Sequence, residues 1–288
     1  MDVHRRSCGS RGRVVWDARS VVSMSEIRVN GVSLYYEEHG DGVPILCIHG
    51  TGSSAKVWGA AVDELAKRGR TIIYDRRGCT RSERPEPYTM TSVGEHTEDA
   101  AALLQALKAT PAVVIGRSYG GEIAVDLVQR YPGLVRALVL LEPAIVTMTA
   151  EAHAWEGALE ANVAAAAATG GPEAGADCFY REILGDDGWA QLPGTWRRMV
   201  LDNAPAILAE LKGGSSRPDQ ERLAHVRKPV LLVSGAASPP VFRAVDSVLA
   251  DLIPGSRHEV VEGGHLIDPA STEVLAFLDG QLAGGSGR

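Results

Sequence analysis

A serine at position 118 is flanked by small residues in the pattern Gly-Arg-Ser-Tyr-Gly, which spans 116–120. An apolar run typical of a strand precedes it and a stretch with helical spacing follows, so Ser118 is expected on a tight turn between the two. Such a turn requires small neighbours, and Gly116 and Gly120 meet this need. A serine hydroxyl held at the carboxyl end of a strand can attack a carbonyl carbon. We prefer this interpretation to a helix N-cap, the other role open to a serine before a helix.

A histidine near the end of the chain can act as the base for this serine. A serine hydroxyl is a weak nucleophile until a base removes its proton. Of the eight histidines, His265 is the best placed, because it follows two glycines and the last predicted strand, 257–262. A loop at that point can reach over the carboxyl edge of a parallel sheet. We therefore expect His265 to lie beside Ser118.

A glycine-rich loop is predicted to bind the oxygen of the same carbonyl. The stretch His-Gly-Thr-Gly over 49–52 follows an apolar run at 44–48, and its small residues let the backbone approach a ligand. The backbone N–H groups of Thr51 and Tyr119 are the expected donors to a tetrahedral oxyanion. The loop lacks the lysine of a phosphate-binding loop and the third glycine of a dinucleotide fingerprint. With no metal-ligand spacing elsewhere, we expect neither a metal nor a cofactor.

The elements that must position these residues alternate between strand and helix. Apolar runs predict the strands, and a period of 3.6 residues predicts the helices. A hairpin with its turn at Asn30-Gly31 opens the pattern. The strands predicted after it are 44–48, 70–74, 112–115, 135–141, 229–234 and 257–262, and the helices are 55–68, 91–108, 119–131, 240–252 and 270–281. Continuous apolar runs suit strands buried on both faces, so we predict a mostly parallel α/β sheet with helices on both sides.

One long stretch interrupts this alternation. Residues 144–224 contain no strand-like run, are rich in alanine and have helical propensity. We predict that they form a helical cap, inserted after the sixth strand into a core domain made of 24–143 and 225–288. The first 23 residues hold five arginines and two aspartates, a charge of +3, and are predicted to be a disordered basic tail.

Composition narrows the classes of function. The chain has 288 residues, of which 45% are apolar, and its net charge is −7. Nucleic acid is not expected as a partner, because phosphate binding needs a basic face. A membrane association is not expected either, because no apolar run approaches the roughly 20 residues of a membrane span. The four cysteines are widely spaced without a C-x-x-C pattern, which argues against a disulfide framework and favours the cytoplasm. The sequence does not indicate an oligomeric state.

Four motifs together resemble those of the α/β-hydrolase superfamily. They are His-Gly-Thr-Gly at 49–52, Asp-Arg-Arg-Gly at 75–78 running to Ser82, Gly-Arg-Ser-Tyr-Gly at 116–120, and Gly264-His265 ahead of Asp268-Pro269. The resemblance extends from about residue 26 to residue 281. It implies a mostly parallel eight-stranded sheet, a helical cap after strand six, and a Ser–acid–His triad. Thr80 is a minor departure, since many members have a second glycine there.

The acid of this triad is not where the superfamily usually places it. Members usually have an aspartate shortly after strand seven, where this chain has Ser238. Glu142, at the end of the sixth predicted strand, can reach the histidine from the neighbouring strand and keeps the order nucleophile, acid, base. Some members, including certain macrolactone hydrolases, place their acid there. We therefore predict Glu142 as the acid, although a salt-bridged carboxylate at the cap hinge would look the same. Asp246 is the alternative acid, and Asp268 is expected to cap the last helix.

Such a triad implies acyl transfer to water. We expect the substrate to be a small carbonyl compound, apolar to moderately polar, with an ester or lactone bond; thioesters and activated amides stay open. Ser118 in the nucleophile position argues against an epoxide hydrolase or haloalkane dehalogenase. A carbon–carbon bond hydrolase or a haloperoxidase-like enzyme would have the same triad. Because the usual aspartate is missing, a non-hydrolytic cyclase or lyase, or a small-molecule receptor, is the alternative from another class.

Overall fold

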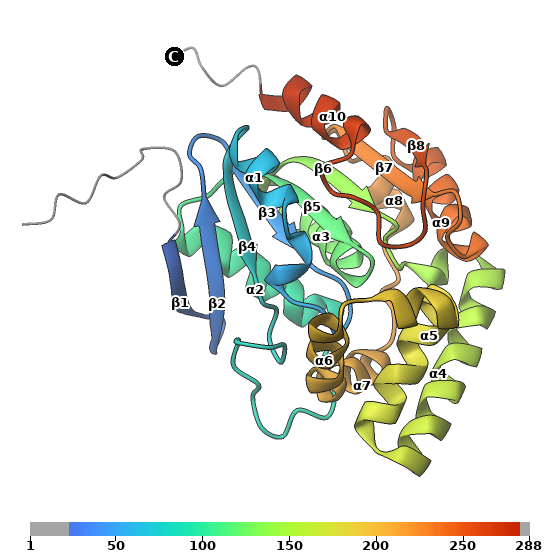
Figure 1. Cartoon of the computed structure of the whole chain (residues 1–288). Helices are drawn as coiled ribbons and strands as arrows, with labels where there is room; N and C mark the ends of the chain where they lie inside the picture. Colours follow the sequence, from blue (N-terminus) through green and yellow to red (C-terminus); the bar gives the residue numbers. More distant parts are fainter. Residues whose placement is uncertain (1–22, 283–288) are drawn as a thin grey trace, which may run out of the picture.

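The computed structural model describes residues 23–282, which are built around one eight-stranded sheet (Figure 1). The sheet order is β1-β2-β4-β3-β5-β6-β7-β8. The strands are β1 (Ser23–Val29), β2 (Val32–His39), β3 (Pro44–Ile48), β4 (Arg70–Tyr74), β5 (Ala112–Arg117), β6 (Val135–Leu141), β7 (Val230–Gly235) and β8 (Arg257–Val261). β1 and β2 pair in antiparallel fashion, and β3 to β8 pair in parallel. The predicted fold class, an α/β-hydrolase fold, is therefore confirmed.

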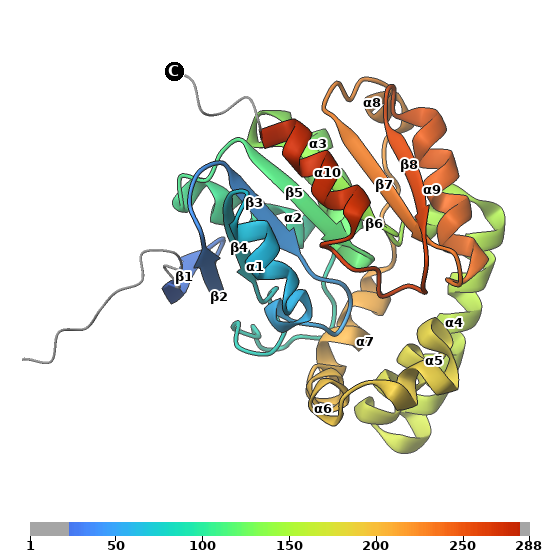
Figure 2. The same ribbon diagram turned by 45° about the horizontal axis from the view of Figure 1, so that its top comes forward.

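Neighbouring residues along the parallel strands pack on opposite faces of the sheet. In β3, Leu46 belongs to one buried apolar cluster and Cys47 to the other, as the pleat of a strand requires. The helices α1 (Ala61–Ala66) and α10 (Thr272–Leu282) cover the face of Cys47 (Figure 2). The opposite face is covered by α2 (Val93–Ala106), α3 (Tyr119–Arg130) and α9 (Pro240–Leu252). Burial on both faces explains why these strands are continuous apolar runs.

One predicted helix is wrong in part. The sequence predicts a single helix over 55–68, but the structure has a 3-10 helix, η1 (Ala55–Trp58), followed by the shorter α1. Gly59 separates the two, because its φ of 45° is a left-handed conformation that ends the first helix. The predicted tail, apart from Ser23 in β1, lies outside the described residues.

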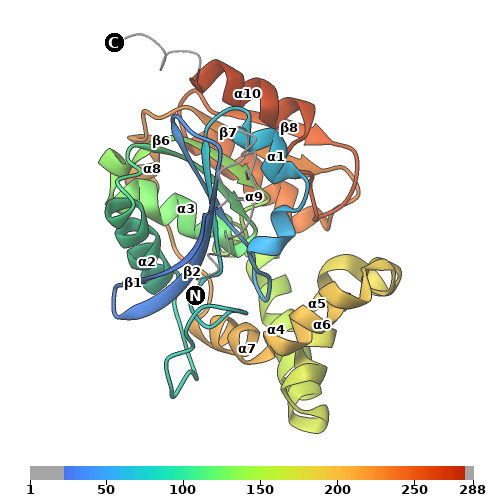
Figure 3. The same cartoon turned by 60° about the vertical axis from the view of Figure 1, so that its left-hand side comes forward.

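Residues 144–224, which lie between β6 and β7, are called the helical segment here. It contains η3 (Val146–Met148), α4 (Ala150–Gly170), α5 (Pro172–Gln191), α6 (Gly194–Asp202), α7 (Ala204–Gly213) and α8 (Gln220–Ala224). Most of these helices gather beyond one end of the sheet (Figure 3). The division of the chain into core and cap domains stays a prediction. Although α4 is 21 residues long, no helix within residues 23–282 has the length and apolar character needed to cross a bilayer.

Candidate active site

Ser118 lies on a sharp turn between β5 and α3. Its backbone has φ 52° and ψ −122°, a conformation that costs energy for a residue with a side chain. The turn is also too tight for larger neighbours. A Cβ on Gly116 would lie 2.4 Å from the carbonyl oxygen of Gly120, and a Cβ on Gly120 would lie 2.1 Å from that of Ile48. The Ser118 carbonyl accepts a hydrogen bond from the Ala144 N–H at 3.1 Å, which ties the turn to the start of the helical segment.

Glu142 and His265 are in direct contact. His265 Nδ1 lies 2.6 Å from Glu142 Oε2, and both residues are buried. The carboxylate also accepts the Gly235 N–H at 2.7 Å and the Ser238 hydroxyl at 2.6 Å. Ser238, at the position where the superfamily usually has its aspartate, thus donates to the carboxylate that contacts His265. A carboxylate at Nδ1 favours the proton on that nitrogen and leaves Nε2 free to accept another.

The two other carboxylates considered from sequence do not bond to His265 among the described residues. Asp246 Oδ2 accepts the Ser234 hydroxyl at 2.6 Å, and burial raises the pKa of Asp246 well above its usual value. Asp268 accepts the Ala270 N–H at 2.9 Å in the turn before α10. The side chain that accepts from the first turn of α10 is that of Ser271, so the expectation that Asp268 caps this helix is wrong.

The glycine-rich loop after β3 runs beside the serine. A Cβ on Gly50 would lie 3.1 Å from the Ser118 Cβ, so only glycine lets the loop pass this closely. Thr51 follows at once, and its carbonyl accepts the Tyr180 hydroxyl at 2.8 Å. Tyr119 is the first residue of α3, so its N–H has no acceptor inside the helix. These positions fit the role predicted for both backbone N–H groups.

A buried arginine that the sequence reasoning did not single out holds this loop. The Arg76 guanidinium donates to the carbonyls of His49 at 3.0 Å and Gly50 at 2.9 Å, and it pairs with Glu210 at 2.8 Å. Burial and the charge of Arg76 lower the pKa of His49 well below its usual value, so that ring is neutral and its Nε2 accepts the backbone N–H of Arg76 at 2.9 Å. Arg76 lies within the Asp-Arg-Arg-Gly motif at 75–78, so that motif could have pointed to it. Nothing local in the sequence pointed to Glu210.

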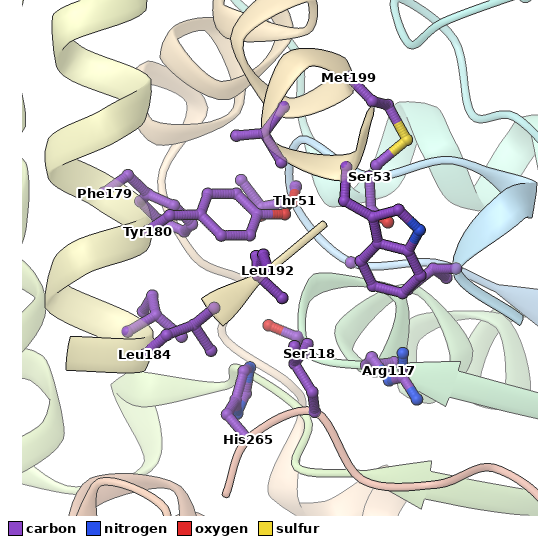
Figure 4. Close-up of a pocket in the computed structure, with 16 residues that line it drawn as sticks. Thr51, Ser53, Arg117, Ser118, Phe179, Tyr180, Leu184, Leu192, Met199 and His265 are labelled. Carbon is purple, nitrogen blue, oxygen red and sulfur yellow. Dashed lines mark hydrogen bonds between the residues drawn. The ribbon is translucent and has the colours of Figure 1, made fainter. Parts of the chain in front are cut away.

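Ser118 and His265 line one pocket together with Thr51, and its empty space of about 560 Å³ includes a part open to solvent. In Figure 4 the Ser118 oxygen points into this space, and the His265 ring lies beside it. Among the described residues, no hydrogen bond joins these two side chains. Such bonds are often long before substrate binds. The rest of the lining is mostly apolar and comes largely from α5 and α6, including Phe179, Tyr180, Ile183, Leu184, Trp196, Met199 and Val200.

The pocket offers no group of metal ligands. Residues 23–282 contain no cluster of three or more histidine, cysteine, aspartate or glutamate side chains suited to hold a metal ion. The described residues around Ser118 supply a hydroxyl group, an imidazole held by a carboxylate, and backbone N–H donors.

Comparison with known proteins identifies the same family. The family model described as the alpha/beta hydrolase fold matches residues 43–170. The chain is 30% identical to RutD of Azorhizobium caulinodans, named as a candidate carbamate hydrolase, over 84% of this chain and 91% of that one. It is 27% identical to 2-(acetamidomethylene)succinate hydrolase of Mesorhizobium japonicum, over 86% of this chain and 90% of that one.

A solved structure agrees over a similar length. Est816, described as an N-acyl homoserine lactone degrading enzyme, superposes with a TM-score of 0.62. Its sequence is 28% identical, and the match covers 89% of this chain and 99% of that one. The sheet order, the turn that carries Ser118 and nearly full-length likeness to these hydrolases together show that the chain belongs to the α/β-hydrolase superfamily.

Proposed function

We propose that this protein is a serine hydrolase that transfers the acyl group of an ester or lactone to water. The observation that carries the proposal is the 2.6 Å contact between Glu142 and His265, which lines the same pocket as Ser118. An oriented imidazole beside a strained serine turn is the arrangement that nucleophilic catalysis requires. The named activity of Est816, degradation of a lactone, supports the choice of substrate bond.

In this mechanism Ser118 Oγ attacks the carbonyl carbon while His265 Nε2 takes the hydroxyl proton. The carbonyl oxygen becomes an oxyanion and accepts hydrogen bonds from the backbone N–H groups of Thr51 and Tyr119. The imidazolium, stabilised by Glu142, then protonates the leaving alcohol as the bond to the acyl carbon breaks. Water attacks the acyl-enzyme by the same route in reverse, with His265 as its base, and releases the acid and free Ser118.

A fluorophosphonate probe and a panel of acyclic esters and lactones test this proposal. We expect stoichiometric labelling at Ser118, and hydrolysis of at least one member of the panel that Ser118→Ala abolishes. Labelling without any hydrolysis would favour a non-hydrolytic member of the superfamily. A folded protein that is neither labelled nor active would rule out the serine mechanism.

A further inference from the structure

The Gly50 carbonyl belongs to the same peptide group as the Thr51 N–H, one of the two predicted oxyanion donors. This peptide bond is trans, so its C=O and its N–H point in opposite directions. Groups that bond to the Gly50 oxygen therefore lie behind the Thr51 donor. Thr51 lines the same pocket as Ser118 (Figure 4), and within residues 23–282 its N–H donates to no other backbone carbonyl. This N–H is therefore free to bond to a ligand.

Three donors surround the Gly50 oxygen. The Arg76 Nη2 atom lies at 2.9 Å, His49 Nδ1 at 2.8 Å and the Ser53 backbone N–H at 3.4 Å. A carbonyl oxygen has two lone pairs, so its capacity as an acceptor is fully used. Arg76 supplies the charged donor of the three.

Arg76 also fixes which nitrogen of His49 carries the proton. The ring is neutral and its Nε2 accepts the Arg76 backbone N–H, so the proton is on Nδ1. Nδ1 then donates this proton to the Gly50 carbonyl. Arg76 thus acts on the carbonyl twice, directly through its guanidinium and indirectly through the tautomer of His49.

The guanidinium of Arg76 is itself held in place. Its Nη2 donates to Gly50 and also to Glu210 at 2.8 Å, and its Nε donates to the His49 carbonyl at 3.0 Å. Burial alone would lower the pKa of Arg76, but the charge of Glu210 raises it above its ordinary value, so the group stays charged. The guanidinium also lies 4.9 Å from the centre of the ring of Tyr119, the other predicted oxyanion residue. A fixed positive charge therefore lies behind the oxyanion hole, in a part of the core that excludes water.

We propose that Arg76 is a positioning residue that orients the 50–51 peptide group and makes the Thr51 N–H a stronger donor to the oxyanion. A charged donor on a carbonyl oxygen polarises the amide, and a polarised amide donates more strongly through its N–H. The gain is largest when the substrate oxygen carries a negative charge, so it favours the transition state over the bound substrate. This inference rests on the proposed serine hydrolase activity and adds Arg76, supported by Glu210, to the residues that serve it.

Replacement of the whole pair, Arg76→Met with Glu210→Leu, tests the proposal without leaving either charge alone. Exchange of a buried ion pair for apolar side chains of similar size is often neutral for stability. Two inhibitors with one carbon skeleton give the readout. The ketone 1,1,1-trifluorooctan-2-one forms an oxyanion when Ser118 adds to it, whereas 1,1,1-trifluorooctan-2-ol cannot.

We expect kcat for ester hydrolysis to fall about 10- to 10²-fold in this double variant, less than the loss of a complete oxyanion donor can cost. The inhibition constant of the ketone should rise by a similar factor. That of the alcohol should change by less than about threefold, because no oxyanion forms. If the double variant does not fold, Arg76→Lys replaces it. The ammonium keeps the charge but not the planar set of donors, so kcat and ketone affinity should again fall together.

Arg77→Met with Asp99→Leu is the matched control. Arg77 is the next residue along the chain, and its buried guanidinium pairs with Asp99 at 2.5 Å. Within the part of the chain that the structure describes, no hydrogen bond joins the Arg77 side chain to the loop at 49–52. This variant should keep kcat and both inhibition constants within about threefold of the unmodified protein. Circular dichroism and urea unfolding check that the variants are folded.

The outcomes separate this proposal from the one on which it rests. If the ketone and the alcohol lose affinity equally, or if a folded variant keeps its kcat and its affinity for the ketone, Arg76 only supports the fold and the inference is wrong. In both cases the hydrolase proposal stands, since Ser118-dependent hydrolysis by the unmodified protein is measured first. If the unmodified protein neither hydrolyses an ester through Ser118 nor prefers the ketone to the alcohol, the hydrolase proposal itself fails.

Discussion

At the scale of single residues, Glu142 and Ser238 act as a complementary pair. A second carboxylate at position 238 would repel Glu142, whereas the serine hydroxyl donates to it at 2.6 Å. The Gly235 N–H occupies the other carboxylate oxygen. The position where the superfamily usually has its aspartate therefore holds a polar side chain that contacts Glu142, which in turn contacts His265.

Glu142→Gln tests the role of this carboxylate. The amide can keep its oxygen on the Gly235 N–H and donate an N–H to the Ser238 hydroxyl, but it cannot stabilise the imidazolium, so we expect kcat to fall about 10⁴-fold with little change in fold. Ester hydrolysis and circular dichroism measure the two effects. Activity near that of the unmodified protein in a folded variant would remove Glu142 from the triad.

Ser238→Asp in the Glu142→Gln background returns the acid to the usual superfamily position. The new carboxylate lies beside the amide at 142, within reach of the His265 loop, so we expect kcat about tenfold or more above that of Glu142→Gln alone. The same substitution in the unmodified protein places two acids together and should lower activity instead. A double variant no more active than Glu142→Gln would contradict this geometry.

Glu122 gives a prediction about pH and stability. Burial raises its pKa to about 8 from 4.5, so between these values the folded protein binds this proton more tightly than the unfolded chain. The contribution of this proton to stability is present below pH 4.5 and is lost as pH rises to 8. Glu122→Gln removes it. The free energy of unfolding of the variant, relative to the unmodified protein, should therefore rise by on the order of 1 kcal/mol per pH unit across this window. Denaturant unfolding at several pH values measures this, and a constant difference would be the contrary result.

At the scale of elements, the site forms where the ends of β3, β5, β6 and β8 meet. The strands at 44–48 and 70–74 have the bounds predicted from sequence, because the first begins at a proline and ends before His49, and the second lies between Gly69 and Asp75. The contact between Glu142 and His265 follows from their places after β6 and β8 in a parallel sheet. The pairing of Arg76 with Glu210 could not be predicted, since it depends on how α7 packs against a loop 134 residues away.

Gly120→Ala tests the close approach of α3 to β3. The added Cβ would lie 2.1 Å from the Ile48 carbonyl oxygen, and neither backbone can yield easily. We expect a loss of about 3 kcal/mol or more in the free energy of unfolding, together with loss of ester hydrolysis.

Gly157→Ala is the matched control for this substitution. Gly157 lies within α4, and a Cβ there meets nothing within 4 Å. Alanine should stabilise this helix by about 0.5–1 kcal/mol. Equal effects of the two substitutions on thermal unfolding would show that the contact with Ile48 does not limit position 120.

At the scale of the whole molecule, a single buried side chain joins the helical segment to two loops of the sheet. Asn203, between α6 and α7, donates to the carbonyls of Gly52 at 3.1 Å and Ser53 at 3.0 Å. Its Oδ1 accepts the Thr80 N–H at 2.8 Å. Thr80, the departure noted in the sequence, therefore contributes to the attachment of the helices. No local pattern around Asn203 could reveal this, because its partners lie more than 120 residues earlier.

Asn203→Ala should weaken the attachment of the helical segment to these two loops. Removal of the amide leaves backbone carbonyls of the glycine-rich loop after β3 without these partners, so we expect a loss of about 2–3 kcal/mol in the free energy of unfolding and reduced kcat. Asn162→Ala, which removes an exposed hydrogen bond to Glu182, is the control and should change stability by about 0.5 kcal/mol or less. Equal stability of the two variants in urea would contradict the assigned role of Asn203.

The attachment of Ala144 limits how this protein can be recombined with its relatives. Its N–H bonds to the Ser118 carbonyl, and Glu142, two positions earlier, contacts His265, so the first residues after β6 are bonded directly to the candidate active site. In a relative with its acid after β7, the same junction can be cut without touching that acid. A chimaera that takes the helices of a relative to change the substrate range must therefore have its junction after Ala144. A junction before Glu142 would also exchange the residues that contact Ser118 and His265.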